Sequence, residues 1–214
     1  MLTFAEELLL LSHDEKTGHF YNMDDAMPAL AGAVLMELAI RNRIDTDLDK
    51  LMVVDGTPTG EAVLDGILAQ MVAEPGIHST DDWVDFLKHN GQEIYDLALE
   101  RLIQRGILRR EESKILWVFG TRRYPLIENR EQQEVKLRIA NLLMSDEIPD
   151  ARDIVIIALA QSCGLLEHIF SVDELESSKA RIDQIVRLDL IGRAVRAAIE
   201  NLRAQTISLA SYPS

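Results

Sequence analysis

The chain contains one cysteine, Cys163, in 214 residues, which excludes an internal disulfide. A single thiol is typical of a reducing compartment. Because Cys163 lies in the apolar run from Ile154 to Ile169, we expect a buried, unreactive side chain. No stretch reaches the roughly 18 uncharged apolar residues of a membrane-spanning helix, and the first residues contain no basic region of a signal peptide. The sequence therefore predicts a cytoplasmic protein.

The usual marks of catalysis and of metal binding are also missing. None of the five histidines falls in an HExxH or similar ligand spacing, and no cysteine pair exists for zinc. GxSxG and GxGxxG do not occur, and the stretch from Gly56 to Gly60 lacks the Gly-Lys-Ser/Thr of a phosphate loop. The 36 acidic residues are too many for any one pair to be informative. We predict no enzymatic activity, no cofactor and no metal.

Acidic residues outnumber basic residues by 36 to 22, which gives a formal net charge of −14. A surface of this sign keeps a protein soluble but repels nucleic acids and anionic membranes over most of its area. Binding to either partner must therefore be local. With 47% hydrophobic residues the chain can bury one core, and we expect a single domain over residues 1–214.

Apolar residues recur at helical spacing through most of the chain, so the predicted fold class is mainly α with short β-hairpins. Capping pairs open three of the predicted helices: Thr3 with Glu6, Ser79 with Asp82, and Ser171 with Glu174. Thr57 before Pro58 predicts a fourth helix start. The other helical patterns cover about 29–41, 81–89, 92–105, 131–144, 151–169 and 174–204, the last with a break.

Strand patterns occur in two places, each directly after a predicted helix. They are Arg43–Asp45 with Leu51–Val54, and Ile107–Arg109 with Ile115–Phe119. The two places align without a gap at an offset of 64 residues, with Asn42 opposite Gly106. Both residue types suit the left-handed position that ends a helix. We predict one helix-stop-hairpin unit used twice, and a chance likeness of two such units is the alternative.

The second unit differs from the first in charge. Residues 101–124 contain seven basic and two acidic residues, about +5, which leaves about −19 for the rest of the chain. Aromatic side chains flanked by arginines favour the interface of an anionic membrane. The predicted membrane or oligomer hairpin comprises Arg109, Arg110, Leu116, Trp117, Val118, Phe119, Arg122 and Arg123. In the membrane interpretation, Leu116, Trp117 and Phe119 enter the interface and the four arginines lie at headgroup level.

Two other interpretations of this segment stay open. A helix that ends in Arg105–Leu108 and is followed by a basic hairpin is also typical of a winged-helix unit, whose arginines would touch DNA phosphates. The preceding helix, 92–105, offers few side chains that could read bases, so nucleic acid is the weaker candidate. In the second alternative, Ile115–Phe119 packs against a neighbouring helix or a second subunit, and the arginines form a solvated rim.

Taken in order, the motifs of this chain resemble those of the Golgi phosphoprotein 3 family. They are Leu2–Leu11, Gly32–Ala39, Pro58–Asp65, Arg105–Leu108, Tyr124–Leu126 and Ile156–Phe170, and they extend over nearly the whole chain. The resemblance implies a mainly helical domain with a projecting hairpin at about 107–123. It also implies a peripheral membrane protein that binds phosphatidylinositol 4-phosphate and, in eukaryotic members, the cytosolic tails of Golgi glycosyltransferases. The family's hairpin is linked to membrane insertion and to self-association, so a homo-oligomer is expected.

The family's headgroup pocket in eukaryotes uses a tryptophan and three arginines. By resemblance, the tryptophan position falls at Tyr21 or Asn22, and the arginine positions fall at Ala31, Gln92 and Tyr95. None of the three is basic here, which removes the strongest hydrogen bonds to a phosphorylated headgroup. The chain also begins at the domain itself, so we expect a prokaryotic-type member without the long N-terminal arm of the eukaryotic proteins.

Overall fold

The computed structural model describes residues 1–21, 23–47, 50–74, 79–112 and 122–188. Its helices are α1 Phe4–Ser12, α2 Met23–Ile40, α3 Ala62–Ala73, α4 Thr80–Lys88, α5 Gly91–Gln104, α6 Arg130–Leu143, α7 Ala151–Ser162, α8 Leu166–Ile169 and α9 Val172–Val186. Two antiparallel strand pairs accompany them: β1 Ile44–Asp47 with β2 Lys50–Val53, and β3 Glu111–Glu112 with β4 Arg122–Arg123. The predicted mainly α fold class is confirmed. In the part of the chain that the structure describes, no helix has the length and apolar character needed to cross a bilayer.

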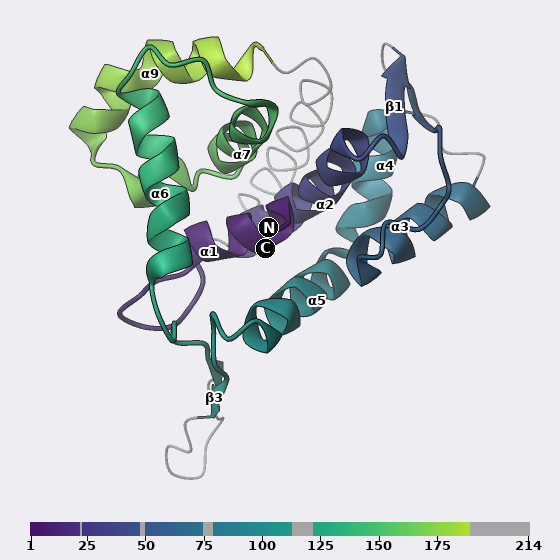
Figure 1. Ribbon diagram of the computed structural model, residues 1–214, viewed down its shortest axis with the longest axis horizontal. Helices are drawn as coiled ribbons and strands as arrows, with labels where there is room; N and C mark the ends of the chain where they lie inside the picture. Colours follow the sequence, from purple (N-terminus) through teal and green to yellow (C-terminus); the bar gives the residue numbers. More distant parts are fainter. Residues whose placement is uncertain (22, 48–49, 75–78, 113–121, 189–214) are drawn as a thin grey trace, which may run out of the picture.

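Helix α1 lies at the centre of the fold, and all nine of its residues are buried. Four consecutive leucines, Leu8 to Leu11, cannot share one face of a helix, so this sequence is stable as a helix only where neighbours surround it. Helices α2, α5, α6 and α7 pack around α1. Figure 1 shows α1 and α2 running between one group of helices formed by α6, α7 and α9 and another formed by α3, α4 and α5.

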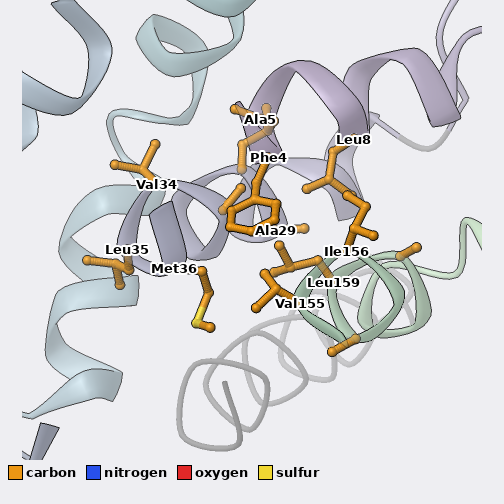
Figure 2. Packing of buried hydrophobic residues seen from close by; sticks show 14 of the residues in the cluster. Phe4, Ala5, Leu8, Ala29, Val34, Leu35, Met36, Val155, Ile156 and Leu159 are labelled. Atoms are coloured by element: carbon orange, nitrogen blue, oxygen red, sulfur yellow. The ribbon is translucent and has the colours of Figure 1, made fainter. Parts of the chain in front are cut away.

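Apolar side chains of α1, α2 and α7 meet in the core, as Figure 2 shows. Phe4 has no exposed surface, and the guanidinium carbon of Arg152 lies 4.2 Å from the centre of its ring. A cation over an aromatic face is favourable, and this contact fastens α7 to the start of α1. Cys163, at the end of α7, is buried as predicted.

Two buried glutamates of α1 connect the helix to its neighbours. Glu6 lies 3.0 Å from Nε of Arg101 on α5, and Glu7 lies 2.8 Å from a terminal nitrogen of Arg138 on α6. A buried carboxylate is costly unless a cation or several hydrogen bonds compensate it, so these contacts orient both helices on α1. Burial nevertheless outweighs the arginines around Glu7 and raises the pKa of its carboxyl.

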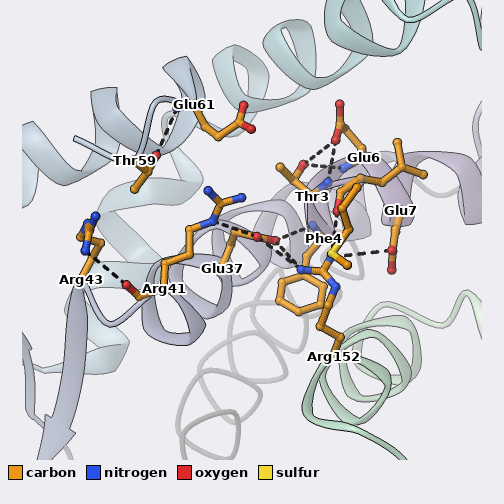
Figure 3. Close-up of polar contacts among 12 residues, drawn as sticks. Thr3, Phe4, Glu6, Glu7, Glu37, Arg41, Arg43, Thr59, Glu61 and Arg152 are labelled. Atoms are coloured by element: carbon orange, nitrogen blue, oxygen red, sulfur yellow. Dashed lines mark hydrogen bonds and ion pairs between the residues drawn. The ribbon is translucent and has the colours of Figure 1, made fainter. Parts of the chain in front are cut away.

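A third buried carboxylate, Glu37 of α2, completes this central network. Glu37 lies 3.1 Å from Nε of Arg41 and 3.3 Å from a terminal nitrogen of Arg152, and it also accepts a hydrogen bond from the backbone N–H of Phe4 at 3.1 Å (Figure 3). The network therefore joins α1, α2 and α7 through one side chain.

The predicted capping pairs are confirmed. Thr3 with Glu6 and Ser171 with Glu174 are both reciprocal capping boxes, at the starts of α1 and α9. Ser79 accepts a hydrogen bond from the backbone N–H of Asp82 at 2.9 Å and caps α4. Residues 189–214, which include much of the last predicted helix, lie outside the described part of the chain.

The predicted helix start at Thr57 and Pro58 is wrong, because α3 begins at Ala62. The carboxylate of Asp65 accepts hydrogen bonds from the Thr59 hydroxyl at 2.7 Å and from the Gly60 backbone N–H at 3.1 Å, which holds these residues as a loop before the helix.

The single helix predicted over 151–169 is also wrong. It is divided into α7 and α8 at Gly164, which has a φ of +70°. A residue with this backbone conformation ends a helix, and glycine adopts it without strain.

Candidate membrane-binding hairpin and its root

A hairpin follows α5, as the sequence predicts, and its first paired residues lie against the helical body. Arg109 donates its backbone N–H to the carbonyl of Pro125 at 3.0 Å, and Leu108 forms a β-bridge with Leu126. The described partner of this strand is therefore the segment with Pro125 and Leu126, and residues 115–119, the partner that the sequence predicts, lie outside the described residues. Beyond these contacts β3 pairs with β4, and Figure 1 shows β3 extending away from the helices.

The loop between α1 and α2 holds this hairpin from the side. Tyr124 donates its backbone N–H to the carbonyl of Gly18 at 2.9 Å. Gly18 has a φ of +70°, and a Cβ at this position would lie 3.4 Å from the backbone nitrogen of Tyr124. The close approach and the positive φ both favour glycine. We call residues 13–20 the root loop, and residues 107–111 with 123–127 the hairpin root.

His13 fixes the same contact from the buried side of the root loop. Its Nε2 lies 2.7 Å from the carbonyl oxygen of Tyr124, and a carbonyl only accepts, so Nε2 carries a proton and donates it. The other ring nitrogen, Nδ1, is buried and has no hydrogen-bond partner among the described residues. Burial lowers the pKa of His13, so the neutral ring is the form that holds the hairpin root.

An aromatic cluster couples the hairpin root to α5. The ring of Phe20 lies 5.3 Å from His13, 5.7 Å from Tyr95 and 5.9 Å from Tyr124, measured between ring centres. Burial raises the pKa of Tyr95, which therefore stays a neutral phenol in this cluster. Because one ring touches elements from three parts of the chain, the root loop, α5 and the hairpin are packed as one unit.

Most of the basic side chains described in residues 101–124 form ion pairs within the chain. Arg101 lies 3.0 Å and Arg105 3.9 Å from Glu6, Arg109 lies 2.6 Å from Glu111, and Arg110 lies 2.8 Å from Glu100. Arg123 forms no ion pair with a described residue. The charge available to an anionic partner is therefore smaller than the count of seven basic residues suggests, although exposed pairs such as Arg109 with Glu111 are weak and can exchange partners.

The outer end of the predicted hairpin lies outside the described residues. This applies to Leu116, Trp117, Val118 and Phe119, and to the side chain of Arg122. The predicted entry of these apolar side chains into a membrane interface stays a prediction.

The positions that the family resemblance assigns to a lipid headgroup do not converge on one surface. Ala31 has no exposed surface and belongs to the core. Tyr95 is half-buried in the aromatic cluster, and Gln92 is exposed and donates a hydrogen bond to Asp96 at 3.0 Å. A carboxylate beside Gln92 disfavours an anionic ligand there. Asn22 lies outside the described residues.

Tyr21 is a second exposed member of that set. Its ring is stacked in parallel on His168, with ring centres 4.7 Å apart. Its hydroxyl donates a hydrogen bond to the carboxylate of Asp14, and this bond is the main reason why the pKa of Asp14 is lowered to about 2. A phosphate that approached the Tyr21 hydroxyl would meet an ionised carboxylate.

A groove of about 510 Å³ lies on another part of the molecule, along α7, α8 and α9. Leu166 and Phe170 contribute apolar surface, while Glu167, Glu176 and Asp183 contribute carboxylates. This charge disfavours an anionic headgroup.

Sequence reasoning missed the role of the root loop. Gly18 and Tyr124 are more than 100 residues apart in the chain, and no motif predicts that they touch. The one local signal is composition: the polar run from Asp14 to His19 contains glycine and is typical of a turn. Nothing in that run indicates that the turn lies beside the basic hairpin.

These features define a helical protein with a hairpin anchored on its central helices, and comparison with known proteins identifies the class. Residues 4–202 match the model of the family Golgi phosphoprotein 3 (GPP34), and the chain belongs to this family. The family consists of Golgi-associated proteins and is not a class of enzymes. The chain is similar to vacuolar protein sorting-associated protein 74 of Eremothecium gossypii, with 28% identity over 211 residues. The match covers 82% of this chain and 63% of that relative, so the chain spans less than two thirds of the relative's length.

Proposed function

We propose that this protein attaches reversibly to anionic membrane surfaces through its second hairpin, and that it serves there as an adaptor for the tails of membrane enzymes. The observation that carries the attachment is the position of the chain's basic, aromatic segment. The aromatic part of this segment, Trp117 and Phe119, falls between β3 and β4 in the sequence, and Figure 1 shows β3 extending away from the helical body. The adaptor role comes from membership of the family, and so does phosphatidylinositol 4-phosphate as a candidate lipid.

The local chemistry favours a general anionic surface over one specific phosphoinositide. Gln92 and Tyr95 bring no positive charge, and Ala31 is buried. Each lysine or arginine near an anionic bilayer contributes about 1 kcal/mol, and aromatic side chains favour the interface itself. The free energy of membrane attachment is then the sum of two contributions, a few cationic contacts with headgroups and the burial of apolar side chains at the end of the hairpin.

Sedimentation with lipid vesicles tests the proposal. The wild type is expected to pellet with vesicles of phosphatidylcholine and phosphatidylserine, and Trp117→Ala/Phe119→Ala is expected to bind on the order of tenfold less, because buried apolar area is lost. The matched control is Met52→Ala/Val54→Ala, which removes two exposed apolar side chains from the first hairpin. This control is expected to pellet as the wild type does. Equal pelleting of the wild type and the Trp117/Phe119 variant, or pelleting of neither, contradicts the proposal.

A subunit contact is the second candidate for the hairpin. The ion pairs Arg109 with Glu111 and Arg110 with Glu100 neutralise part of the hairpin's positive charge, which suits a protein partner better than an anionic membrane. Light scattering distinguishes the two. If the hairpin joins subunits, replacing residues 113–121 by a short turn reduces the assembly size, and an unchanged size rules this candidate out.

The described surface gives little support to DNA binding. In a winged-helix unit, α5 would be the helix nearest the DNA, but it exposes Glu93 and Asp96 and carries Glu100 beside the hairpin. Carboxylates in these positions repel a phosphate backbone.

A further inference from the structure

We infer that Lys16, His19 and Arg123 form a phosphate-binding site where the root loop meets the hairpin root. This assignment rests on the membrane attachment proposed above, and it names the residues that contact the lipid headgroup. The chemistry is that of a phosphate ester, which all three side chains can hold by charge or by hydrogen bonds.

The first support is the placement of the three residues. Gly18 accepts the backbone hydrogen bond from Tyr124, and a Cβ on Gly18 would lie 3.6 Å from Cβ of Arg123. Lys16 and His19 lie within two residues of Gly18 in the same turn, and Gly18 is the residue of this turn that lies beside β4. The side chains of Lys16, His19 and Arg123 are all exposed.

The second support is that these basic side chains have no acidic partner among the described residues. The other two arginines of the hairpin root, Arg109 and Arg110, are held by Glu111 and Glu100. Glu111 lies opposite Arg123 in the strand register, but its carboxylate contacts Arg109 at 2.6 Å.

The acidic residues of the root loop contact groups other than the side chains of the proposed site. The carboxylate of Asp14 accepts hydrogen bonds from the backbone N–H groups of Lys16 at 2.7 Å and Thr17 at 2.9 Å, and from the Tyr21 hydroxyl. The carboxylate of Glu15 contacts Lys136 of α6 at 3.4 Å, and it also accepts a hydrogen bond from Gln133 at 2.9 Å. Asp14 stays ionised, because these hydrogen bonds lower its pKa to about 2, but among the described residues neither carboxylate forms an ion pair with the side chain of Lys16, His19 or Arg123.

The third support is the position of the site along the hairpin. The hairpin root lies where the strands leave the helical body (Figure 1). If the outer end enters the interface, the root lies at the depth of the lipid phosphates, and Arg123 with the root loop is the surface they meet. His13 and Gly18 keep the loop in this place, so they act as positioning residues.

The test compares Lys16→Gln/Arg123→Gln with Lys179→Gln/Arg187→Gln. Both variants remove two exposed positive charges, and the second pair lies on and just after α9, away from the root loop. With vesicles of phosphatidylcholine and phosphatidic acid, the root variant is expected to bind on the order of tenfold less than the α9 variant. Unchanged unfolding midpoints in urea show that both variants are folded.

A second arm uses free glycerol 3-phosphate, followed by NMR of the wild type. Shifts confined to the signals of the root loop and of Arg123 are expected if the site recognises the phosphate group itself. If glycerol 3-phosphate causes no shift but the root variant binds vesicles more weakly than the α9 variant, the site is a headgroup site that needs the membrane surface. Both results support the assignment.

The outcomes separate this assignment from the function on which it rests. If the wild type pellets and the Trp117/Phe119 variant does not, the membrane attachment holds. If, in addition, the root and α9 variants pellet equally and glycerol 3-phosphate causes no shifts, the phosphate site is wrong. If the wild type does not pellet but glycerol 3-phosphate shifts the root-loop signals, the site holds and the membrane attachment is wrong. If the wild type does not pellet and glycerol 3-phosphate causes no shifts, the membrane attachment and the phosphate site are both wrong.

Discussion

Asn42 and Gly106 end two helices in the same way, 64 residues apart. Asn42 has a φ of +55° and Gly106 a φ of +71°. Each ends its helix with the same pair of backbone hydrogen bonds, N–H of Asn42 to Ala39 and of Arg43 to Leu38, and N–H of Gly106 to Ile103 and of Ile107 to Leu102. Every donor and acceptor of one pair lies 64 positions from its counterpart. The predicted equivalence of these two helix ends is confirmed at the level of single hydrogen bonds.

This equivalence predicts the cost of substitutions at Gly106. A Cβ there meets nothing within 4 Å, so the cost arises from the positive φ alone. We expect Gly106→Ala to lower the free energy of unfolding by about 1 kcal/mol, and Gly106→Asn to lower it by clearly less, because asparagine already occupies position 42 in the same conformation. Urea unfolding measures both, and Asn42→Gly serves as the reciprocal control with a change near zero. Equal losses for Gly106→Ala and Gly106→Asn would contradict the interpretation.

The ion pair between Arg110 and Glu100 predicts a gain of membrane binding. Glu100→Gln releases Arg110 from its partner, so more positive charge faces an anionic surface. We expect Glu100→Gln to bind vesicles of phosphatidylcholine and phosphatidylserine up to about fivefold more tightly at low salt, with the gain shrinking as salt rises. Vesicle sedimentation over a salt series measures the effect.

Glu93→Gln is the matched control for this prediction. It makes the same change in net charge on the same helix, but Glu93 forms no ion pair with a described residue. If the two variants bind equally, only the net charge matters, and the pair between Arg110 and Glu100 does not restrain the hairpin.

The fold could be predicted from the sequence where the signal is local. Thr3 with Glu6 and Ser171 with Glu174 are complete capping boxes, and all of the groups that form each box lie within four residues. The start of α3 could not be predicted in this way. Asp65 accepts hydrogen bonds from Thr59 and Gly60, six and five residues back, and this local loop replaces the helix start that Thr57 and Pro58 alone predict.

The candidate site could be predicted only in part, because its charges depend on contacts between distant parts of the chain. The basic, aromatic composition of residues 101–124 indicates the hairpin directly. Which of its charges are free depends on partners from other parts of the chain, such as Glu6 for Arg101 and Glu100 for Arg110. The contact between Gly18 and Tyr124, which brings the root loop to Arg123, connects distant segments and has no local signature.

The raised pKa of Glu7 predicts how stability depends on pH. Burial raises this pKa above its ordinary value of 4.5, so the folded state binds more protons than the unfolded state between 4.5 and the raised value. The contribution of Glu7 to the free energy of unfolding is therefore present below pH 4.5 and is lost as the pH rises through the folded pKa. Glu7→Gln removes this loss, so its stability relative to the wild type is expected to increase from about pH 4 to pH 7.

Urea unfolding at several pH values checks this prediction through the difference between the two proteins. The attraction between Arg138 and ionised Glu7 titrates with Glu7 itself and already forms part of the folded pKa, so the pH trend reports the net effect of burial and ion pairing. The exposed Glu93→Gln is the control and is expected to show no such upward trend. The free energy of unfolding of Glu7→Gln minus that of the wild type is the quantity to follow. If this difference stays constant or falls with rising pH, burial does not govern the titration of Glu7.

The lowered pKa of His13 predicts that acid loosens the hairpin root. The folded pKa lies below the ordinary value of 6.5, so the unfolded state binds more protons between these two values, and the stability that His13 contributes is lost as the pH falls through the folded pKa. A proton on Nδ1 would place a charge and an unpaired donor in a buried site. His13→Gln keeps an amide that can donate to the carbonyl of Tyr124 but cannot titrate. We therefore expect the stability advantage of the wild type over His13→Gln to shrink as the pH falls below 6.5.

Hydrogen exchange at the backbone amide of Tyr124 locates the effect, because this amide donates to Gly18 in the root loop. Corrected for the intrinsic rate, its protection is expected to fall with acid in the wild type and to change less in His13→Gln. His89→Gln, at the exposed end of α4, replaces an imidazole ring that is not part of the root, so the protection at Tyr124 in this variant is expected to follow the wild type. If the protection at Tyr124 responds to acid equally in all three proteins, His13 does not hold the hairpin root through its neutral ring. Loss of the His13 ring would then have no effect on the hydrogen bond between Tyr124 and Gly18.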